Sequence, residues 1–264
     1  MFDQIKVELC SVWGGDRDAA LGAWASTYDK TKAEGKTDDD VRRLVTDLVH
    51  LHHDTPKERV WLDFFITCPI FVERQFDKYR MTLQYQDFVV EYLEAPMGRD
   101  HITQNELSGR YRTIPDRPYS LPADVDTILR RADRDCLLSF EYGQLLEKQH
   151  RWYQEALRTL RQAEIEKKIT NTEYKRSREV LRGVLGTSFL TDMRVVMNMN
   201  AFEHIINQRL ARAAQMESRV VACRMIKTLE SGNAIPVMLD EMVKANGWQP
   251  LVDETVEAIN EDGK

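Results

Sequence analysis

One stretch of the chain, residues 122–168, constrains the fold more than any other. Its apolar residues recur three and four positions apart, beginning with Leu138, Tyr142 and Leu145 and continuing through Tyr153 and Leu157. Charged residues occupy much of the opposite side of this pattern. Because residues at these spacings share one face of an α-helix, the stretch predicts an extended surface helix.

Three shorter stretches have the composition of β-strands, at 5–13, 61–68 and 187–199. Helices are expected at 16–33 with Asp16 as N-cap, after Thr37, from Pro69 onward, and at 171–184, 200–211 and 213–230. Residues 81–122 are expected to be irregular. No internal repeat divides the chain, so we expect one domain over residues 1–264. Its class is α/β (α+β), a small sheet with long helices and a mobile tail at 247–264.

The charge balance argues against a protein that coats duplex nucleic acid. The chain has 37 basic and 43 acidic residues, a formal charge of −6, whereas such proteins usually carry the opposite balance. A basic pocket for a small phosphate remains compatible with this charge. No stretch of 18 uninterrupted apolar residues and no signal peptide is found, so we expect a cytoplasmic protein without a membrane partner.

Neither a disulfide framework nor a metal site is indicated. The four cysteines are widely spaced and form no CxxC pair, which suggests reduced thiols in or near the core. His50, His52 and His53 could suggest metal ligands, but no matching cysteines, histidines or carboxylates accompany them. The arginines of 122–168 could suggest RNA binding, but acidic residues interleave with them. A solvated face or a subunit contact is the better interpretation of that stretch.

The loop HITQNELSGRYRT at 101–113 concentrates hydrogen-bonding side chains around one glycine. Ser108, the Gly109 amide and Arg110 could form an anion cradle, because an arginine presents a planar fork to phosphate oxygens. A polar loop with a type I turn explains the same composition. The loop alone leaves both interpretations open.

A set of motifs, taken in order along residues 5–230, resembles the flavin-dependent thymidylate synthases. The matching blocks are HDTPKE at 53–58, PIFVERQ at 69–75, NELSGRY at 105–111, REVLR at 178–182, Asn198, and Arg209 followed by Gln215 and Glu217. Two departures stand out. Lys78-Tyr79-Arg80 replaces the family's Arg-His-Arg, and Asn200 replaces a frequent arginine.

A third departure is an insertion of about 20 residues, 83–102, because 24 residues separate Arg80 from Asn105 where the family has four. Its first half has the spacing of an amphipathic short helix. We expect a docked flap over the active site or a subunit contact beside it. A disordered surface loop is the alternative.

The resemblance implies a flavoprotein methyltransferase of dTMP biosynthesis. Its reaction would be reductive methylation of dUMP to dTMP, with methylenetetrahydrofolate as carbon donor and NADPH as reductant through bound FAD. It also implies a small, mostly antiparallel sheet flanked by long helices, in a homotetramer whose subunits share the sites. No enzyme nucleophile is needed, so Cys68 is expected to be a core residue.

The resemblance also assigns residues. The substrate-binding positions are Gln75, Ser108, Gly109, Arg110, Arg182 and Arg209. Of these, Arg209, Ser108 and Arg182 are the expected catalytic residues. The FAD-binding positions are Thr55, Glu58, Lys78, Tyr79, Arg80, Asn105, Glu106, Asn198 and His204.

Two rival functions stay open. The first is a sister enzyme that uses the same flavin and folate chemistry on another pyrimidine nucleotide, or leaves a hydroxymethyl group. The second is a helical assembly or nucleic-acid-binding protein that kept the fold and lost catalysis.

Overall fold

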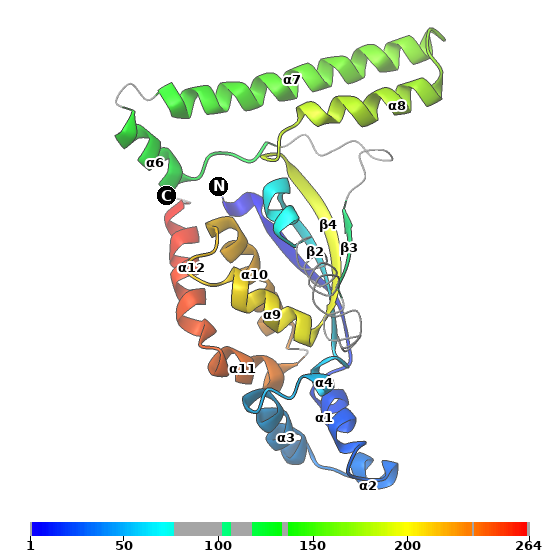
Figure 1. Ribbon diagram of the computed structural model, residues 1–264, viewed down its shortest axis with the longest axis vertical. Coiled ribbons are helices and arrows are strands. Elements are labelled where there is room, and N and C mark those ends of the chain that lie inside the picture. Colours follow the sequence, from blue (N-terminus) through cyan, green and yellow to red (C-terminus); the bar gives the residue numbers. More distant parts are fainter. Residues whose placement is uncertain (1, 77–101, 107–117, 134–136, 234, 263–264) are drawn as a thin grey trace, which may run out of the picture.

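The computed structural model describes residues 2–76, 102–106, 118–133, 137–233 and 235–262 (Figure 1). Its sheet is four-stranded and antiparallel throughout, with the strand order β1-β2-β4-β3. The strands are β1 (Lys6–Trp13), β2 (Trp61–Pro69), β3 (Ile102–Glu106) and β4 (Leu190–Asn198). The expected fold class, a small antiparallel sheet with long helices, is confirmed.

Helices account for most of the rest of the described chain. The α-helices are α1 (Asp16–Trp24), α2 (Lys30–Glu34), α3 (Asp38–His50), α4 (Asp54–Lys57), α6 (Ala123–Ala132), α7 (Leu137–Ile165), α8 (Asn171–Leu181), α9 (Met199–Arg209), α10 (Met216–Gly232), α11 (Pro236–Ala245) and α12 (Trp248–Asp262). Residues 70–76 are also helical, and two 3-10 turns occur at Phe2–Gln4 and Arg182–Val184. Among the described helices, none is long and apolar enough to cross a lipid bilayer.

The core lies between one face of the sheet and the helices α9 to α12 (Figure 1). Alternate residues of β2 and β4, among them Phe64 and Val195, point into it and are fully buried. The ring of Phe64 stacks on Phe202 of α9, with centroids 6.3 Å apart, and Phe202 contacts Trp248 of α12 edge-on. This packing fixes α9 against the sheet and α12 against α9.

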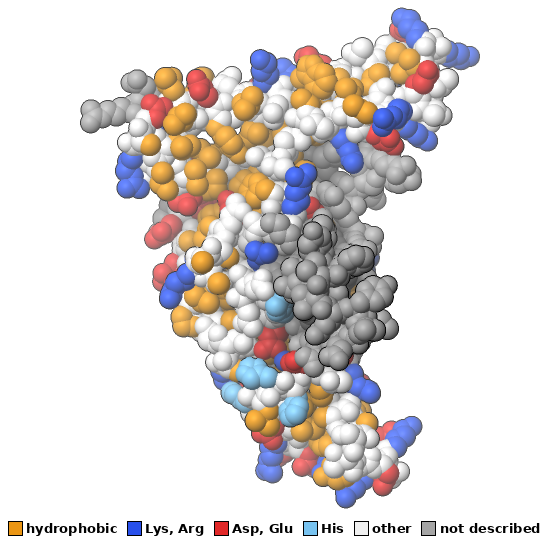
Figure 2. Space-filling model, in the orientation of Figure 1, with side chains coloured by type: hydrophobic (Ala, Val, Ile, Leu, Met, Phe, Trp, Pro, Cys, Tyr) orange, Lys and Arg blue, Asp and Glu red, His pale blue; other side chains and the backbone are white. Residues whose placement is uncertain are grey.

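Helices α7 and α8 form an antiparallel arm beyond one end of the sheet (Figure 1). Helix α7 has 29 residues, yet its buried residues are Leu146, Tyr153 and Leu157 alone. Hydrophobic side chains gather along this arm on the surface (Figure 2). Phe140 is 65% exposed and Trp152 is 46% exposed. The extended surface helix is therefore confirmed, although it begins at Leu137, and the separate helix α6 covers 123–132.

The expected helix at 16–33 is wrong in its extent and in its cap. It is divided into α1 and α2, and the N-cap of α1 is Gly15. The Asp16 carboxylate instead accepts hydrogen bonds from the backbone N–H groups of Val237 (3.0 Å) and Met238 (2.9 Å). It thus caps the N-terminus of α11, a helix that the sequence pattern did not predict. By contrast, α3 begins after Thr37 as expected, and Thr37 and Asp40 form a capping box there.

Three further expectations differ from the structure. The stretch 81–122, expected to be irregular, contains β3, which pairs with β4. Residues 248–262, expected to be a mobile tail, form α12, where Trp248, Val252 and Thr255 are buried. Pro69 is the last residue of β2 instead of the first residue of a helix. The insertion at 83–102 lies outside the described residues, apart from Ile102.

Candidate functional site

The described part of the chain includes about half of the residues expected at the site. Gln75, Arg182, Arg209, Thr55, Glu58, Asn198 and His204 are described with their side chains, whereas Asn105 and Glu106 are placed as backbone in β3. Lys78, Tyr79, Arg80, Ser108, Gly109 and Arg110 lie outside the described residues. The site is therefore built from the first group.

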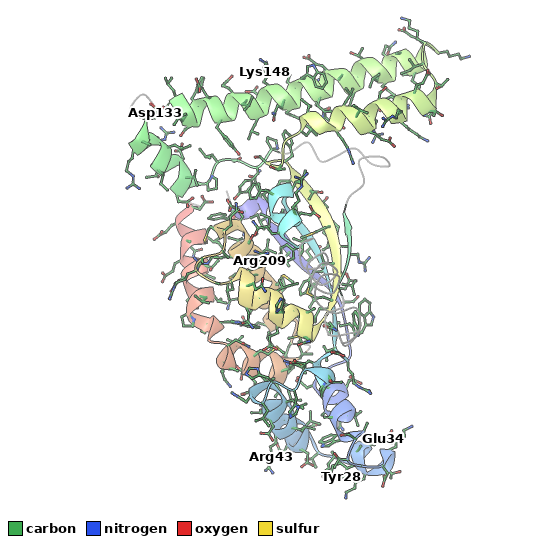
Figure 3. All side chains as sticks on the ribbon, in the orientation of Figure 1. Tyr28, Glu34, Arg43, Asp133, Lys148 and Arg209 are labelled. Carbon is green, nitrogen blue, oxygen red and sulfur yellow. The ribbon has the colours of Figure 1, made fainter. Side chains whose placement is uncertain are left out.

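Gln75 and Arg209 meet although they lie 134 positions apart in the sequence. Arg209 is the last residue of α9, and its guanidinium is half-buried (Figure 3). Its Nη1 donates to Gln75 Oε1 (3.2 Å), and its Nη2 donates to the Gln75 backbone carbonyl oxygen (3.2 Å). The side chain and the backbone of one residue thus hold the cationic fork of Arg209. Such a held cation suits a phosphate or a polarised base.

Two residues of the α10 N-terminus complete this cluster. Ser218 Oγ donates to Gln75 Oε1 (2.8 Å), and Gln75 Nε2 donates to Gln215 Oε1 (2.6 Å). The sequence motif includes Gln215, but nothing in the sequence singled out Ser218. The Ser218 side chain is fully buried, so its hydroxyl is a fixed part of the protein interior. We call Gln75, Arg209, Gln215 and Ser218 the Gln75 cluster.

A buried hydrogen bond lies beside this cluster, between Tyr119 and α10. The Tyr119 hydroxyl donates to Glu217 Oε1 (3.4 Å), and both side chains are buried. Burial raises the pKa of the Glu217 carboxyl above its usual range, because a charged carboxylate loses hydration there. Burial also raises the pKa of Tyr119, and the neighbouring Glu217 adds to that rise. Glu217 immediately precedes Ser218 in α10, so this hydrogen bond adjoins the Gln75 cluster.

Four of the expected flavin-contacting residues, Thr55, Glu58, Asn198 and His204, lie near the end of the sheet where β2 begins and β4 ends. Trp61 of β2 pairs with Asn198 of β4, and Met199 N donates to the Val60 carbonyl oxygen (2.9 Å). The short helix α4 carries Thr55 and precedes Glu58, and it contacts α9. The sheet therefore brings α4 close to the start of α9.

A buried lysine attaches α4 to α9. Lys57 is 1% exposed, and its Nζ forms ion pairs with Glu203 on α9 and with Asp54 (3.0 Å). Glu203 Oε1 also accepts from Asn246 Nδ2 (2.8 Å). Neither Lys57 nor Glu203 was expected at the site. Lys57 lies inside the matched block 53–58, and Glu203 adjoins His204.

Two expected flavin-contacting residues have different surroundings. The Asn198 side chain is buried, and its Oδ1 accepts from Ala201 N (2.8 Å), so it caps α9. The His204 side chain is exposed, six residues further along the chain on α9, and its Nε2 lies 2.9 Å from Gln208 Nε2. Asn198 thus shapes the start of α9, while His204 lies at its surface.

Arg182 stands apart from the Gln75 cluster. It follows α8 on the arm, it is exposed, and it takes no part in the hydrogen bonds of the cluster among the residues that the structure describes. In the same described ranges, no group of three or more His, Cys, Asp or Glu side chains could hold a metal ion. Cys68 is fully buried within β2, which confirms its place in the core.

A family comparison covers most of this architecture. Residues 8–232 match the model of the Thy1 family, described as thymidylate synthase complementing protein. The match includes the sheet, the Gln75 cluster and the α4–α9 contact. The chain belongs to the Thy1 family.

Curated relatives of this Thy1 protein are flavin-dependent thymidylate synthases. The one from Streptomyces avermitilis is 24% identical over 270 residues, covering 98% of this chain and 92% of the relative. The one from Thermotoga neapolitana is 26% identical and covers 86% of each chain. The one from Thermus thermophilus is 27% identical and covers 84% of this chain and 70% of the relative.

A solved structure supports the fold. It is the crystal structure of the UMP/dUMP methylase PolB from Streptomyces cacaoi bound with 5-Br dUMP. The TM-score is 0.62 with 20% sequence identity, and the match covers 91% of this chain and 95% of the other. At this identity the likeness shows a shared Thy1 fold.

Proposed function

We propose that this Thy1 protein methylates dUMP at C5 to give dTMP, with FAD, NADPH and methylenetetrahydrofolate. Family membership supports the flavin chemistry. The single observation that carries the nucleotide assignment is the Gln75–Arg209 contact, because it unites two residues that the motif match assigns to nucleotide binding. The two residues lie 134 positions apart in the sequence, so the packing of the helices brings them together.

In this scheme the Gln75 cluster binds and orients the nucleotide. Arg209 neutralises negative charge on the phosphate or on the uracil oxygens, and Gln75 restricts how its guanidinium can turn. A charge-assisted hydrogen bond of this kind contributes roughly 1.5–3 kcal/mol. Ser108, Gly109, Arg110 and Arg182 are proposed to complete the site.

The residues around α4 fit a large polar cofactor. Lys57 and Glu203 hold the one-turn helix α4 in place, so the exposed Thr55 and the adjoining Glu58 are presented on a fixed turn near the exposed His204. We assign these three side chains, with Lys78, Tyr79, Arg80, Asn105 and Glu106, to FAD binding. Bound FAD would supply hydride transfer from NADPH to the methylene carbon. The buried Asn198 supports this site by capping α9.

A homotetramer is part of the proposal. A groove of about 1090 Å³ runs along α7 and is lined in part by Leu138, Leu145 and Trp152. Soluble proteins seldom leave a large apolar patch uncovered, so we propose that another copy of the chain covers it. Arg182 lies exposed on this arm and would then serve the nucleotide site of a neighbouring subunit.

The experiment that tests the function is simple. The purified chain should bind FAD and show flavin absorbance, and it should oxidise NADPH faster when dUMP is present. A protein that stays colourless after FAD titration would contradict the enzyme assignment and favour the non-catalytic relative.

One second candidate is favoured by a specific observation. The matching solved structure is named a UMP/dUMP methylase, so UMP is a rival substrate for this chain. Turnover measured with UMP, dUMP and dCMP, with the product identified by mass, separates these cases. A hydroxymethyl product would be recognised in the same measurement.

A further inference from the structure

The carboxamide of Gln75 has a defined direction. Its Oε1 accepts from Arg209 Nη1 (3.2 Å) and from Ser218 Oγ (2.8 Å). Its Nε2 donates to Gln215 Oε1 (2.6 Å). A guanidinium has only donors, so the opposite orientation would set the Gln75 NH2 group against another donor. The hydrogen bonds therefore determine which end of the amide faces which way.

Ser218 is the buried part of this arrangement. Its side chain is fully buried in α10, whereas Gln215, the N-cap residue of α10, is exposed. A buried hydroxyl cannot exchange its partner for water without a cost, so Ser218 keeps donating to Gln75. The exposed Gln215 can turn away into solvent. The Oε1 end of the amide is thus held by a buried residue, whereas the Nε2 end contacts a surface residue that a ligand oxygen can displace.

We propose that Ser218 is a positioning residue that fixes Gln75 as a hydrogen-bond donor toward an acceptor oxygen of the bound pyrimidine nucleotide, and that Gln215 competes with that oxygen. This inference rests on the proposed function of the Gln75 cluster. The acceptor is a phosphate oxygen or a carbonyl oxygen of the base. Both are oxygens that accept from an amide NH2 group.

The proposal gives opposite expectations for the two neighbours of Gln75. Ser218→Ala removes the buried donor and leaves the longer contact from Arg209 Nη1 (3.2 Å) as the remaining hydrogen bond to Gln75 Oε1. The amide is then held less tightly, so nucleotide binding weakens. One neutral hydrogen bond corresponds to a roughly two- to tenfold rise in Kd. Gln215→Ala removes the competing acceptor, so binding tightens by roughly the same factor. Ser218→Thr keeps the hydroxyl and restores binding.

The test uses the FAD-loaded protein and titration calorimetry with dUMP. Ser231→Ala is the matched control, because Ser231 lies on the same helix, is exposed and donates to the Lys227 carbonyl oxygen. Thermal unfolding of each variant reports stability. In turnover, Ser218→Ala should raise KM for dUMP with kcat little changed, a split that a merely structural defect would not produce. Titration with deoxyuridine, which lacks the phosphate, identifies the acceptor: a loss that persists indicates a base carbonyl, and a loss that vanishes indicates a phosphate oxygen.

Two results would overturn the inference while leaving the proposed function intact. They are an unchanged Kd in Ser218→Ala and a Kd for Gln215→Ala that is unchanged or higher. A wild-type chain that binds FAD but no pyrimidine nucleotide would instead contradict the proposed function itself, and this role of Gln75 with it.

Discussion

The buried ion pair between Lys57 and Glu203 leads to a sharp prediction about stability. Lys57→Met removes the charge but keeps the length of the side chain. Asp54, whose side chain is 36% exposed, can then turn to water. Glu203 is 9% exposed, and within the described ranges Asn246 remains as its partner. The substitution therefore lowers the free energy of unfolding mainly because Glu203 becomes a buried charge without its counterion.

The magnitude follows from this burial. Removing one partner of a buried ion pair typically costs about 3–5 kcal/mol of stability. Glu203 still accepts a hydrogen bond from Asn246, so we expect a loss at the lower end of this range, about 3 kcal/mol. Glu203→Gln should cost less, because Asp54 still pairs with Lys57 at 3.0 Å. The double variant Lys57→Met/Glu203→Leu should recover to within about 1 kcal/mol of the wild type, since it leaves neither charge buried.

Urea unfolding followed by circular dichroism measures these values, at one protein concentration because self-association shifts the midpoint. Lys244→Met is the matched control. Its side chain is 57% exposed and pairs with Asp240 and Glu241 in water, so its loss should cost far less than the loss of Lys57. The reasoning would be refuted if Lys57→Met cost no more than this control, or if the double variant were as unstable as the single one.

Four other predictions can be measured directly. Arg209→Ala should weaken dUMP binding about ten- to a hundredfold in calorimetry, whereas the exposed Arg212→Ala should not, and equal losses would argue against the nucleotide site. Cys68→Ser should keep measurable turnover, and an inactive variant that still folds and binds flavin would mean that a thiolate takes part. Phe140→Asp on α7 should reduce the oligomer size in light scattering. An unchanged size would show that this surface is not a subunit contact. Because burial raises the pKa of Glu217 above 4.5, the native state holds that proton more tightly than the unfolded state. The unfolding free energy of the wild type, relative to Glu217→Gln, should therefore fall as the pH rises from 4.5 through the raised pKa, and a pH-independent difference would contradict this.

Local patterns in the sequence were sufficient for much of the fold. The composition of 5–13, 61–68 and 187–199 predicted β1, β2 and β4, because strand-forming residues are concentrated there. Thr37 predicted the start of α3, and the capping box that the structure shows there between Thr37 and Asp40 needs only residues three positions apart. These features depend on neighbours in the chain, which the sequence shows directly.

Elements without a local signal were missed or misjudged. Strand β3 reads ITQNE, a short polar run whose strand conformation depends on pairing with β4. Helix α12 carries acidic residues that suggest a tail, yet Trp248 and Val252 pack into the core. Asp16 was expected to cap its own helix, but it caps α11, more than 200 positions away.

The candidate site divides in the same way. The motif match selected Gln75, Arg209, Thr55 and His204 from their order along the chain, without stating which of them meet. Only the tertiary structure joined Gln75 to Arg209, and only the tertiary structure added Lys57 and Ser218. Both additions act through burial and through partners that lie 146 and 143 positions away. A hydrogen bond depends on distance in space, so residues that are remote in sequence acquire their roles only when the sheet and its helices have packed.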